Sequence, residues 1–233
     1  MYVKLDGLFR PDRKNIQIMI KRVTGVYFSP VGGTKKIAER LTAEIAACLN
    51  ASCPDEITTS CVDLLVPGPV TGIFDEETVA VIGMPVYVGK VPLPAVQRLK
   101  NLAVSGCNAV IAVSYGGRSY GNALYELQHF AEEQGFKVIG AGAFSVRYGK
   151  RHGVRESAMD DSCIREFSKA ASAKIARLAG CEIEGLRIKP APLHVVGKLP
   201  IHRISRISPA AAAVAQGMLE KICFRRRNSE WYL

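Results

Sequence analysis

The six residues from Ser29 to Thr34 form a turn of small side chains that has the makings of a phosphate site. An apolar run with Val26 and Phe28 leads into SPVGGT, and an amphipathic helix is expected directly after it. Backbone N–H groups and hydroxyls at the start of a helix that follows a strand can bind a phosphate group. The spacing is neither GxGxxG nor GxxxxGK[ST]. The turn therefore fits either a phosphate site or a tight structural turn.

Two later loops are rich in tyrosine and glycine. The first is PVYVGK at residues 85–90, and the second is YGGRSYG at residues 115–121. Tyrosine rings can flank a flat ring, and glycines let a backbone approach it closely. Arg118 in the second loop is either a solvated surface charge or a ligand contact.

Alternating strands and helices are expected to bring these loops together. Helical spacing of apolar residues follows the first, third, fourth and fifth strands. Five strands are predicted, at residues 23–28, 57–65, 78–84, 107–114 and 137–144. The third and fourth are almost continuously apolar, as parallel strands buried on both faces are. Because each parallel crossover needs a covering helix, we expect an α/β fold with a doubly wound five-stranded parallel sheet.

In such a sheet, ligands bind beyond the carboxyl ends of the strands, where the winding changes direction. The first, third and fourth predicted strands end in the turn at 29–34 and the loops at 85–90 and 115–121. The sequence therefore predicts that a phosphate turn and two tyrosine loops meet at one edge.

These motifs, in this order, resemble the flavodoxin superfamily. The resemblance is closest to the flavodoxin domain of flavodoxin–ferredoxin fusion proteins. It rests on YFSPVGGTKKIAE (27–39), GMPVYVGKVP (83–92), SYGGRSYGNAL (114–124) and GFKVIGAGAF (135–144). It implies a flavodoxin-like sheet with strand order 2-1-3-4-5 and an FMN site.

The resemblance also implies which residues contact FMN. The phosphate would be held by Ser29, Val31, Gly32, Gly33 and Thr34. Tyr87 would stack on one flavin face, and Tyr120, or alternatively Tyr115, on the other. Backbone groups of the loops at 85–90 and 115–121 would reach the polar edge of the flavin ring. The peptide between Val88 and Gly89 would turn over as the flavin is reduced. The remaining predicted contacts are Pro85, Val86, Val88, Gly89, Ser114, Gly116, Gly117 and Arg118.

Three departures from the family pattern stand out. The usual phosphate loop has Thr at the position of Val31 and Asn at that of Gly33, so one hydroxyl and one amide are missing. Common flavodoxins are acidic, whereas this chain is basic. After residue 180 the ferredoxin cysteine runs are absent, and only Cys181 and Cys223 remain. No iron–sulfur cluster is therefore expected.

The cysteines, the histidines and the one pair of adjacent aspartates are scattered along the sequence. The seven cysteines contain no CxxC pair, and the four histidines are not at metal-ligand spacing, so no metal site is predicted. His152 lies near the predicted ligand edge, either as a ligand contact or as a surface histidine. Asp160 and Asp161 are adjacent on an expected helix and face different directions, so no acid–base role is assigned to them.

Composition places the chain among globular proteins, with 48% hydrophobic and 22% charged residues. No apolar run approaches the length of a membrane span, and the N-terminus lacks a signal-peptide core, so a cytoplasmic protein is expected. The formal charge of +10 is compatible with an acidic partner protein. Nucleic-acid binding is not expected, because no recognition motif accompanies the charge.

The predicted organisation has three parts. Residues 1–22 form an N-terminal extension, residues 23–180 the flavodoxin-like domain, and residues 181–233 a loop and an Ala-rich helical extension. The function expected first is an FMN-binding electron carrier between protein partners. The alternatives are an NAD(P)H-dependent FMN oxidoreductase acting on a quinone or small acceptor, and a binding or scaffold module without flavin. No catalytic residue is assigned.

Overall fold

The computed structural model describes residues 19–52, 56–66, 72–116, 119–146, 161–179 and 230–232. Strands and helices alternate along most of this length. In chain order the elements are β1 (Arg22–Tyr27), α1 (Gly33–Asn50), β2 (Thr58–Asp63), β3 (Thr78–Pro85), α2 (Leu93–Leu99), β4 (Asn108–Tyr115), α3 (Ala123–Glu133), β5 (Lys137–Ser145), α4 (Asp161–Leu178) and β6 (Glu230–Tyr232).

The strands form one sheet in the order β2-β1-β3-β4-β5-β6. The first five strands in this order are parallel, which confirms the predicted order 2-1-3-4-5, while β6 runs antiparallel to β5. The register pairs Tyr27 with Gly83 and Pro85 with Ser114. The carboxyl ends of β1, β3 and β4 therefore lie at the same edge.

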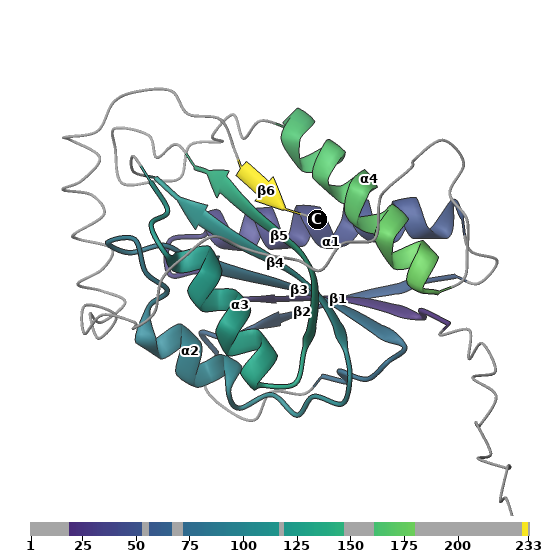
Figure 1. The fold of residues 1–233 in the computed structure, drawn as a ribbon, viewed down its shortest axis with the longest axis horizontal. Coiled ribbons are helices and arrows are strands. Elements are labelled where there is room, and N and C mark those ends of the chain that lie inside the picture. The colour runs from purple at the N-terminus through teal and green to yellow at the C-terminus, as the bar shows by residue number, and fades with distance from the viewer. Residues whose placement is uncertain are drawn as a thin grey trace, which may run out of the picture.

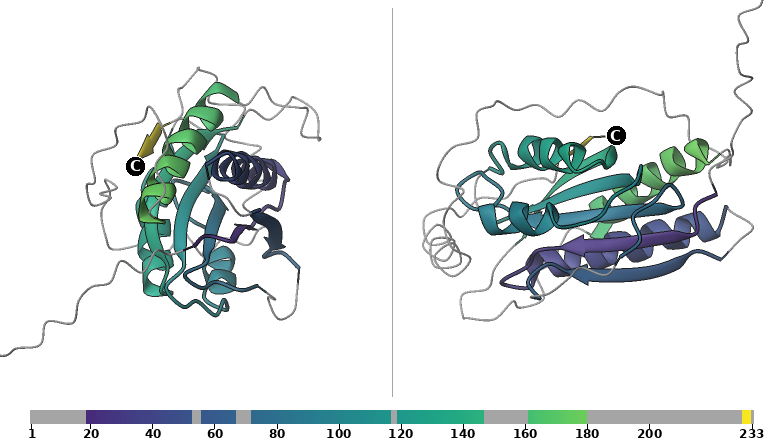
Figure 2. Two further views of the ribbon diagram at one scale, coloured as in Figure 1. Left: turned by 90° about the vertical axis from the view of Figure 1, so that its right-hand side faces the viewer. Right: turned by 90° about the horizontal axis from the view of Figure 1, so that it is seen from below.

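Helices cover both faces of the sheet (Figures 1 and 2). The helices α1 and α4 pack against each other on one face, and α2 and α3 lie on the opposite face. In α1, Ile37, Leu41 and Ile45 recur at helical spacing and are fully buried, because that stripe faces the sheet. The connections on the two faces make the sheet doubly wound.

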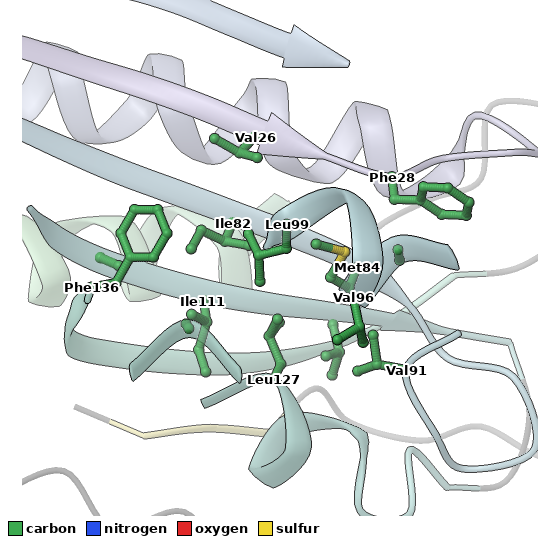
Figure 3. Close-up of a cluster of buried hydrophobic side chains, with 14 of the residues drawn as sticks. Val26, Phe28, Ile82, Met84, Val91, Val96, Leu99, Ile111, Leu127 and Phe136 are labelled. Atoms are coloured by element: carbon green, nitrogen blue, oxygen red, sulfur yellow. The ribbon is translucent and has the colours of Figure 1, made fainter. Parts of the chain in front are cut away.

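The central strands supply most of the core. Every residue of β3 and β4 is buried, as expected for parallel strands covered on both faces. Figure 3 shows Leu99 of α2 and Leu127 of α3 among the side chains that pack with Ile82 and Ile111 of the sheet. The core thus fixes the strand ends from which the predicted ligand loops start.

Two edge features differ from the sequence expectation. The side chains at the start of β2 are exposed rather than buried, and β6 adds a strand that no sequence pattern indicated. Most of the N-terminal extension (residues 1–18), the Ala-rich helix and His152 lie outside the described residues. No helix in the described ranges is both long and apolar enough to cross a membrane.

Candidate functional site

The turn between β1 and α1 places an open backbone at the start of the helix. Gly32, the N-cap residue of α1, has a φ of 85° in the left-handed region. A Cβ added to Gly32 would meet no heavy atom within 4 Å, so the space beside it is open. The turn is held by the Gly32 N–H, which donates to the Ser29 carbonyl at 3.3 Å. Glycine is favoured here because the conformation disfavours a side chain.

The first turn of α1 has donors available for an anion. An α-helix leaves its first N–H groups without intrahelical acceptors. The Lys35 N–H donates to Ser29 Oγ at 2.9 Å, whereas the N–H groups of Gly33 and Thr34 have no acceptor among the described residues. No acidic residue lies in this first turn. The positive end of the helix is therefore suited to a phosphate group.

A buried hydroxyl pair connects the turn at residues 29–34 to β4. Thr34 Oγ1 and Ser114 Oγ lie 2.6 Å apart, and both residues are almost fully buried. Because Ser114 is at the carboxyl end of β4, this hydrogen bond fixes the start of α1 against the strand that precedes the third loop. Two predicted site residues are thus in direct contact.

The loop after β3 contains a tight two-residue turn. The Tyr87 N–H donates to the Lys90 carbonyl at 2.9 Å, and the Lys90 N–H donates to the Tyr87 carbonyl at 3.1 Å. The central residues Val88 and Gly89 have φ values of 53° and 74°. Positive φ at both positions defines a type I′ turn. A β-branched residue is strained there, so Val88 is an unusual occupant.

The turn after β3 packs closely on the loop after β4. The Asn122 N–H donates to the Gly89 carbonyl at 2.9 Å. A Cβ added to Gly121 would lie 2.6 Å from the Gly89 oxygen, so no side chain fits there. The second and third predicted loops therefore meet through their backbones. Of the third loop, Gly117 and Arg118 lie outside the described residues.

The tyrosines of these two loops are buried or partly buried. Tyr87 is 5% and Tyr115 is 3% exposed. Tyr120 is half-buried and meets Tyr115 edge-on, with ring centroids 5.7 Å apart. The exposed side chains of the first two loops are instead Val31 and Val88, at 39% and 48%. Flavin stacking by Tyr87 and Tyr120 stays a prediction.

A buried ion pair that was not predicted from the sequence lies behind these loops. Lys90 Nζ lies 2.5 Å from Glu126 Oε1 of α3, and the Glu126 side chain is fully buried. Glu126 shares the apolar face of α3 with Ala123 and Leu127. The sequence signal for this pair was the charged Glu126 on the otherwise apolar, buried face of α3.

The remaining candidates lie away from this edge. Burial raises the pKa of the Cys107 thiol to about 12, so this cysteine stays protonated. His129 on α3 is partly exposed, and its Nε2 lies 3.1 Å from Glu133 Oε1. Within the described ranges, no group of three or more His, Cys, Asp or Glu residues is placed to hold a metal ion.

Several solved structures are similar to this one. They include a flavodoxin from the domain Archaea, with 16% identity over 67% of this chain and 99% of that chain and a TM-score of 0.46. A flavoprotein in complex with FMN from Lactobacillus acidophilus has 18% identity over 64% of this chain and 99% of that one, with a TM-score of 0.41. A flavodiiron core from Synechocystis has 14% identity and a TM-score of 0.46, and 71% of this chain matches 37% of it.

No family model matches the sequence, and no curated protein matches it. The identities and TM-scores of these solved structures are too low to assign the fold, so the fold is assigned from the strand order of the sheet. The order of its five parallel strands is that of the flavodoxin-like fold.

Proposed function

We propose that the chain is a member of the flavodoxin superfamily that binds FMN at the carboxyl edge of its sheet and carries electrons between protein partners. The observation that carries this proposal is the convergence of three loops from β1, β3 and β4. The Thr34–Ser114 hydrogen bond joins the first loop to the end of β4, and the Gly89–Gly121 contact joins the second loop to the third.

The residues at the start of α1 fit a phosphate group. The open space beside Gly32, the N–H groups of Gly33 and Thr34, and the lack of an acidic residue in the first turn all favour an anion. The Ser29 hydroxyl accepts from Lys35 N–H and keeps its own proton for a phosphate oxygen. These groups bind and orient the phosphate end of FMN in this proposal.

The ring end of the cofactor is assigned to the other two loops. The exposed turn at Val88 and Gly89 would supply backbone groups to the polar ring edge, with Pro85, Val86 and Tyr87 behind it. The third loop would contribute Ser114 to Arg118 and Tyr120. Bound FMN supplies one- and two-electron transfer, while the chain's own residues bind it, orient it and limit the access of water.

A flavin-free binding module is the second candidate, and two observations favour it. Tyr87 and Tyr115 are buried in the protein itself, and the Thr34 hydroxyl is already hydrogen-bonded to Ser114. If this arrangement persists, the loops are structural and their exposed surface is available for a partner. An NAD(P)H-dependent oxidoreductase has no observation of its own in its favour.

A titration with FMN and riboflavin separates these functions. Riboflavin has the same ring system without the phosphate, so a site built as proposed quenches FMN fluorescence at micromolar concentration and binds riboflavin more weakly. Binding also raises the melting temperature of the protein. A colourless protein whose melting temperature is unchanged by tens of micromolar FMN contradicts the flavin function. Bleaching of the loaded protein by NADPH alone would favour the oxidoreductase.

A further inference from the structure

The ion pair between Lys90, in the loop after β3, and Glu126 of α3 is buried rather than at the surface. Glu126 is 0% exposed and the Lys90 side chain is 10% exposed. One carboxylate oxygen accepts from Lys90 Nζ at 2.5 Å, and the other accepts from the Val91 N–H at 3.2 Å. The two oxygens of Glu126 therefore bind the last residue of the turn at residues 87–90 and the residue that follows it.

That turn needs external support. Val88 has a φ of 53°, in the left-handed region that a β-branched residue disfavours. Strained backbone conformations persist only where the surroundings hold them. The two hydrogen bonds between Tyr87 and Lys90 close the turn, but they tie it only to itself. The contacts to α3 and its N-terminal loop attach it to the rest of the fold.

The start of α3 contacts the turn at two points. Asn122, the N-cap residue of α3, donates its N–H to the Gly89 carbonyl at 2.9 Å. One turn further along the helix, Glu126 binds Lys90 and Val91. The N-terminal turn of α3 thus holds both the tip of the loop and its exit.

We propose that Glu126, acting through Lys90 and Val91, is a positioning residue that holds the turn at 87–90 in its flavin-binding shape. The inference rests on the proposed function, because this turn is the one assigned to the polar edge of the flavin ring. Glu126 itself does not touch the ligand. Its loss changes how tightly FMN binds by releasing the backbone of Val88 and Gly89.

Glu126→Gln is the most direct variant. Glutamine has nearly the same shape, but an NH2 group replaces one of the two acceptor oxygens, so it cannot present separate oxygens to Lys90 and Val91 as the carboxylate does. It also leaves the Lys90 ammonium buried without a counter-charge, which is destabilising. Adding Lys90→Met removes that charge. The double variant is therefore expected to regain stability, but not the contacts by which Glu126 holds the turn.

Glu133→Gln is the matched control. Glu133 is on the same helix and pairs with Lys100 at 3.5 Å, but both side chains are about half exposed. Its loss is expected to leave the turn unchanged. The three variants and the unaltered chain are compared by FMN dissociation constant, melting temperature and amide hydrogen exchange of Val91 in the protein without FMN.

The expected result separates stability from positioning. Glu126→Gln and the double variant both bind FMN at least about tenfold more weakly, and their Val91 amide exchanges faster, although the double variant melts closer to the unaltered chain. If Glu126→Gln does not fold, the double variant carries the test. If the FMN affinity of the variants follows their melting temperatures, or does not change, the inference about Glu126 is overturned while the proposed function still stands. An unaltered chain that does not bind FMN overturns the proposed function and this inference with it.

Discussion

The turn at residues 29–34, proposed to hold the phosphate, offers backbone N–H donors more than side-chain donors. Ser29 Oγ already accepts from Lys35 N–H, and the Thr34 hydroxyl is engaged with Ser114. Val31 adds no polar group, although its side chain is 39% exposed at the mouth of the turn. The loop therefore lacks one hydroxyl at a position where a hydroxyl would be accommodated.

Val31→Thr is expected to strengthen FMN binding about three- to tenfold. A hydrogen bond to a charged group contributes roughly 1.5–3 kcal/mol at best, and part of this is lost because the new hydroxyl is exposed. The substitution removes no buried packing. Fluorescence titration measures the effect, with riboflavin as the ligand that should not respond.

Val66→Thr is the control for that prediction. Val66 is also exposed, at 62%, and follows β2 instead of β1. It is expected to leave FMN affinity unchanged. An equal gain in both variants, or a gain for riboflavin, would mean that the turn at residues 29–34 does not hold the phosphate.

Val88→Asn is expected to raise the free energy of unfolding by about 1 kcal/mol. Strain of the kind Val88 carries costs on the order of 1–3 kcal/mol, and asparagine is preferred at this position of a type I′ turn. Because Val88 is 48% exposed, little packing is lost. Urea unfolding of the FMN-free protein measures this. A destabilised variant would contradict the left-handed conformation at Val88.

The same conformation bears on the peptide between Val88 and Gly89. If this peptide turned over while Val88 kept its positive φ, the turn would become type II′, which has glycine at that position. Val88 therefore resists the reorientation that the family resemblance implies. The sequence pattern located the turn, but the φ of Val88 depends on contacts with α3 that only the fold reveals.

At the scale of elements, the second and third loops form a seam in which the backbones of Gly89 and Gly121 meet. Gly121→Ala would place a Cβ 2.6 Å from the Gly89 oxygen and force a left-handed residue to carry a side chain. We expect it to lower the free energy of unfolding by roughly 1–2 kcal/mol and to weaken FMN binding at least tenfold, measured by titration.

Gly106→Ala is its matched control. Gly106 also has a positive φ, but an added Cβ there meets the far ends of the Glu76 and Lys137 side chains, which can move. A similar loss of stability with normal FMN affinity is expected, because Gly106 lies at the amino ends of the strands. If Gly121→Ala binds FMN normally, the seam does not shape the site.

At the amino edge of the sheet, Asp75 contributes stability that depends on pH. Burial favours the neutral form of Asp75, but hydrogen bonds from Thr78 and Arg22 and the Arg22 charge outweigh it, so the pKa of Asp75 is lowered. Its stabilisation is present above the unfolded-state pKa near ~4 and is lost as the pH falls through the lower folded-state value.

Asp75→Asn is therefore expected to destabilise the protein more at pH 7 than in acid. Thermal unfolding from neutral pH to about pH 2 measures the difference between the two proteins, which should shrink as the pH falls. Glu76→Gln, at an exposed neighbour that pairs with Lys137, is the comparison. A difference that grows in acid would contradict the lowered pKa.

The sequence predicted best the bounds of the strands that are buried along their whole length. Both β3 and β4 are buried on both faces, so their continuous apolar runs gave bounds within one residue. The strand β6 was missed because three residues carry no period, and its place depends on pairing with Ala141 to Ala143 across the sheet. The Lys90–Glu126 pair was missed because the partners are 36 positions apart.

Over the whole molecule, charge is unevenly distributed. The described residues contain equal numbers of basic and acidic side chains, so the formal charge of +10 belongs to residues outside them. The proposed site therefore sits on an electrically balanced fold. Attraction to an acidic partner would depend on the remaining segments, such as the arginine run at residues 225–227.

The most direct measurement of the central claim is the change in backbone amide NMR shifts when FMN is added to the full chain. The largest changes are expected in residues 29–34, 85–90 and 114–121, with little change at the amino edge around Asp75 and Gly106. Riboflavin should perturb the second and third loops but not the first. Absence of any saturable change, or changes centred elsewhere, would contradict the assignment of this edge as a flavin site.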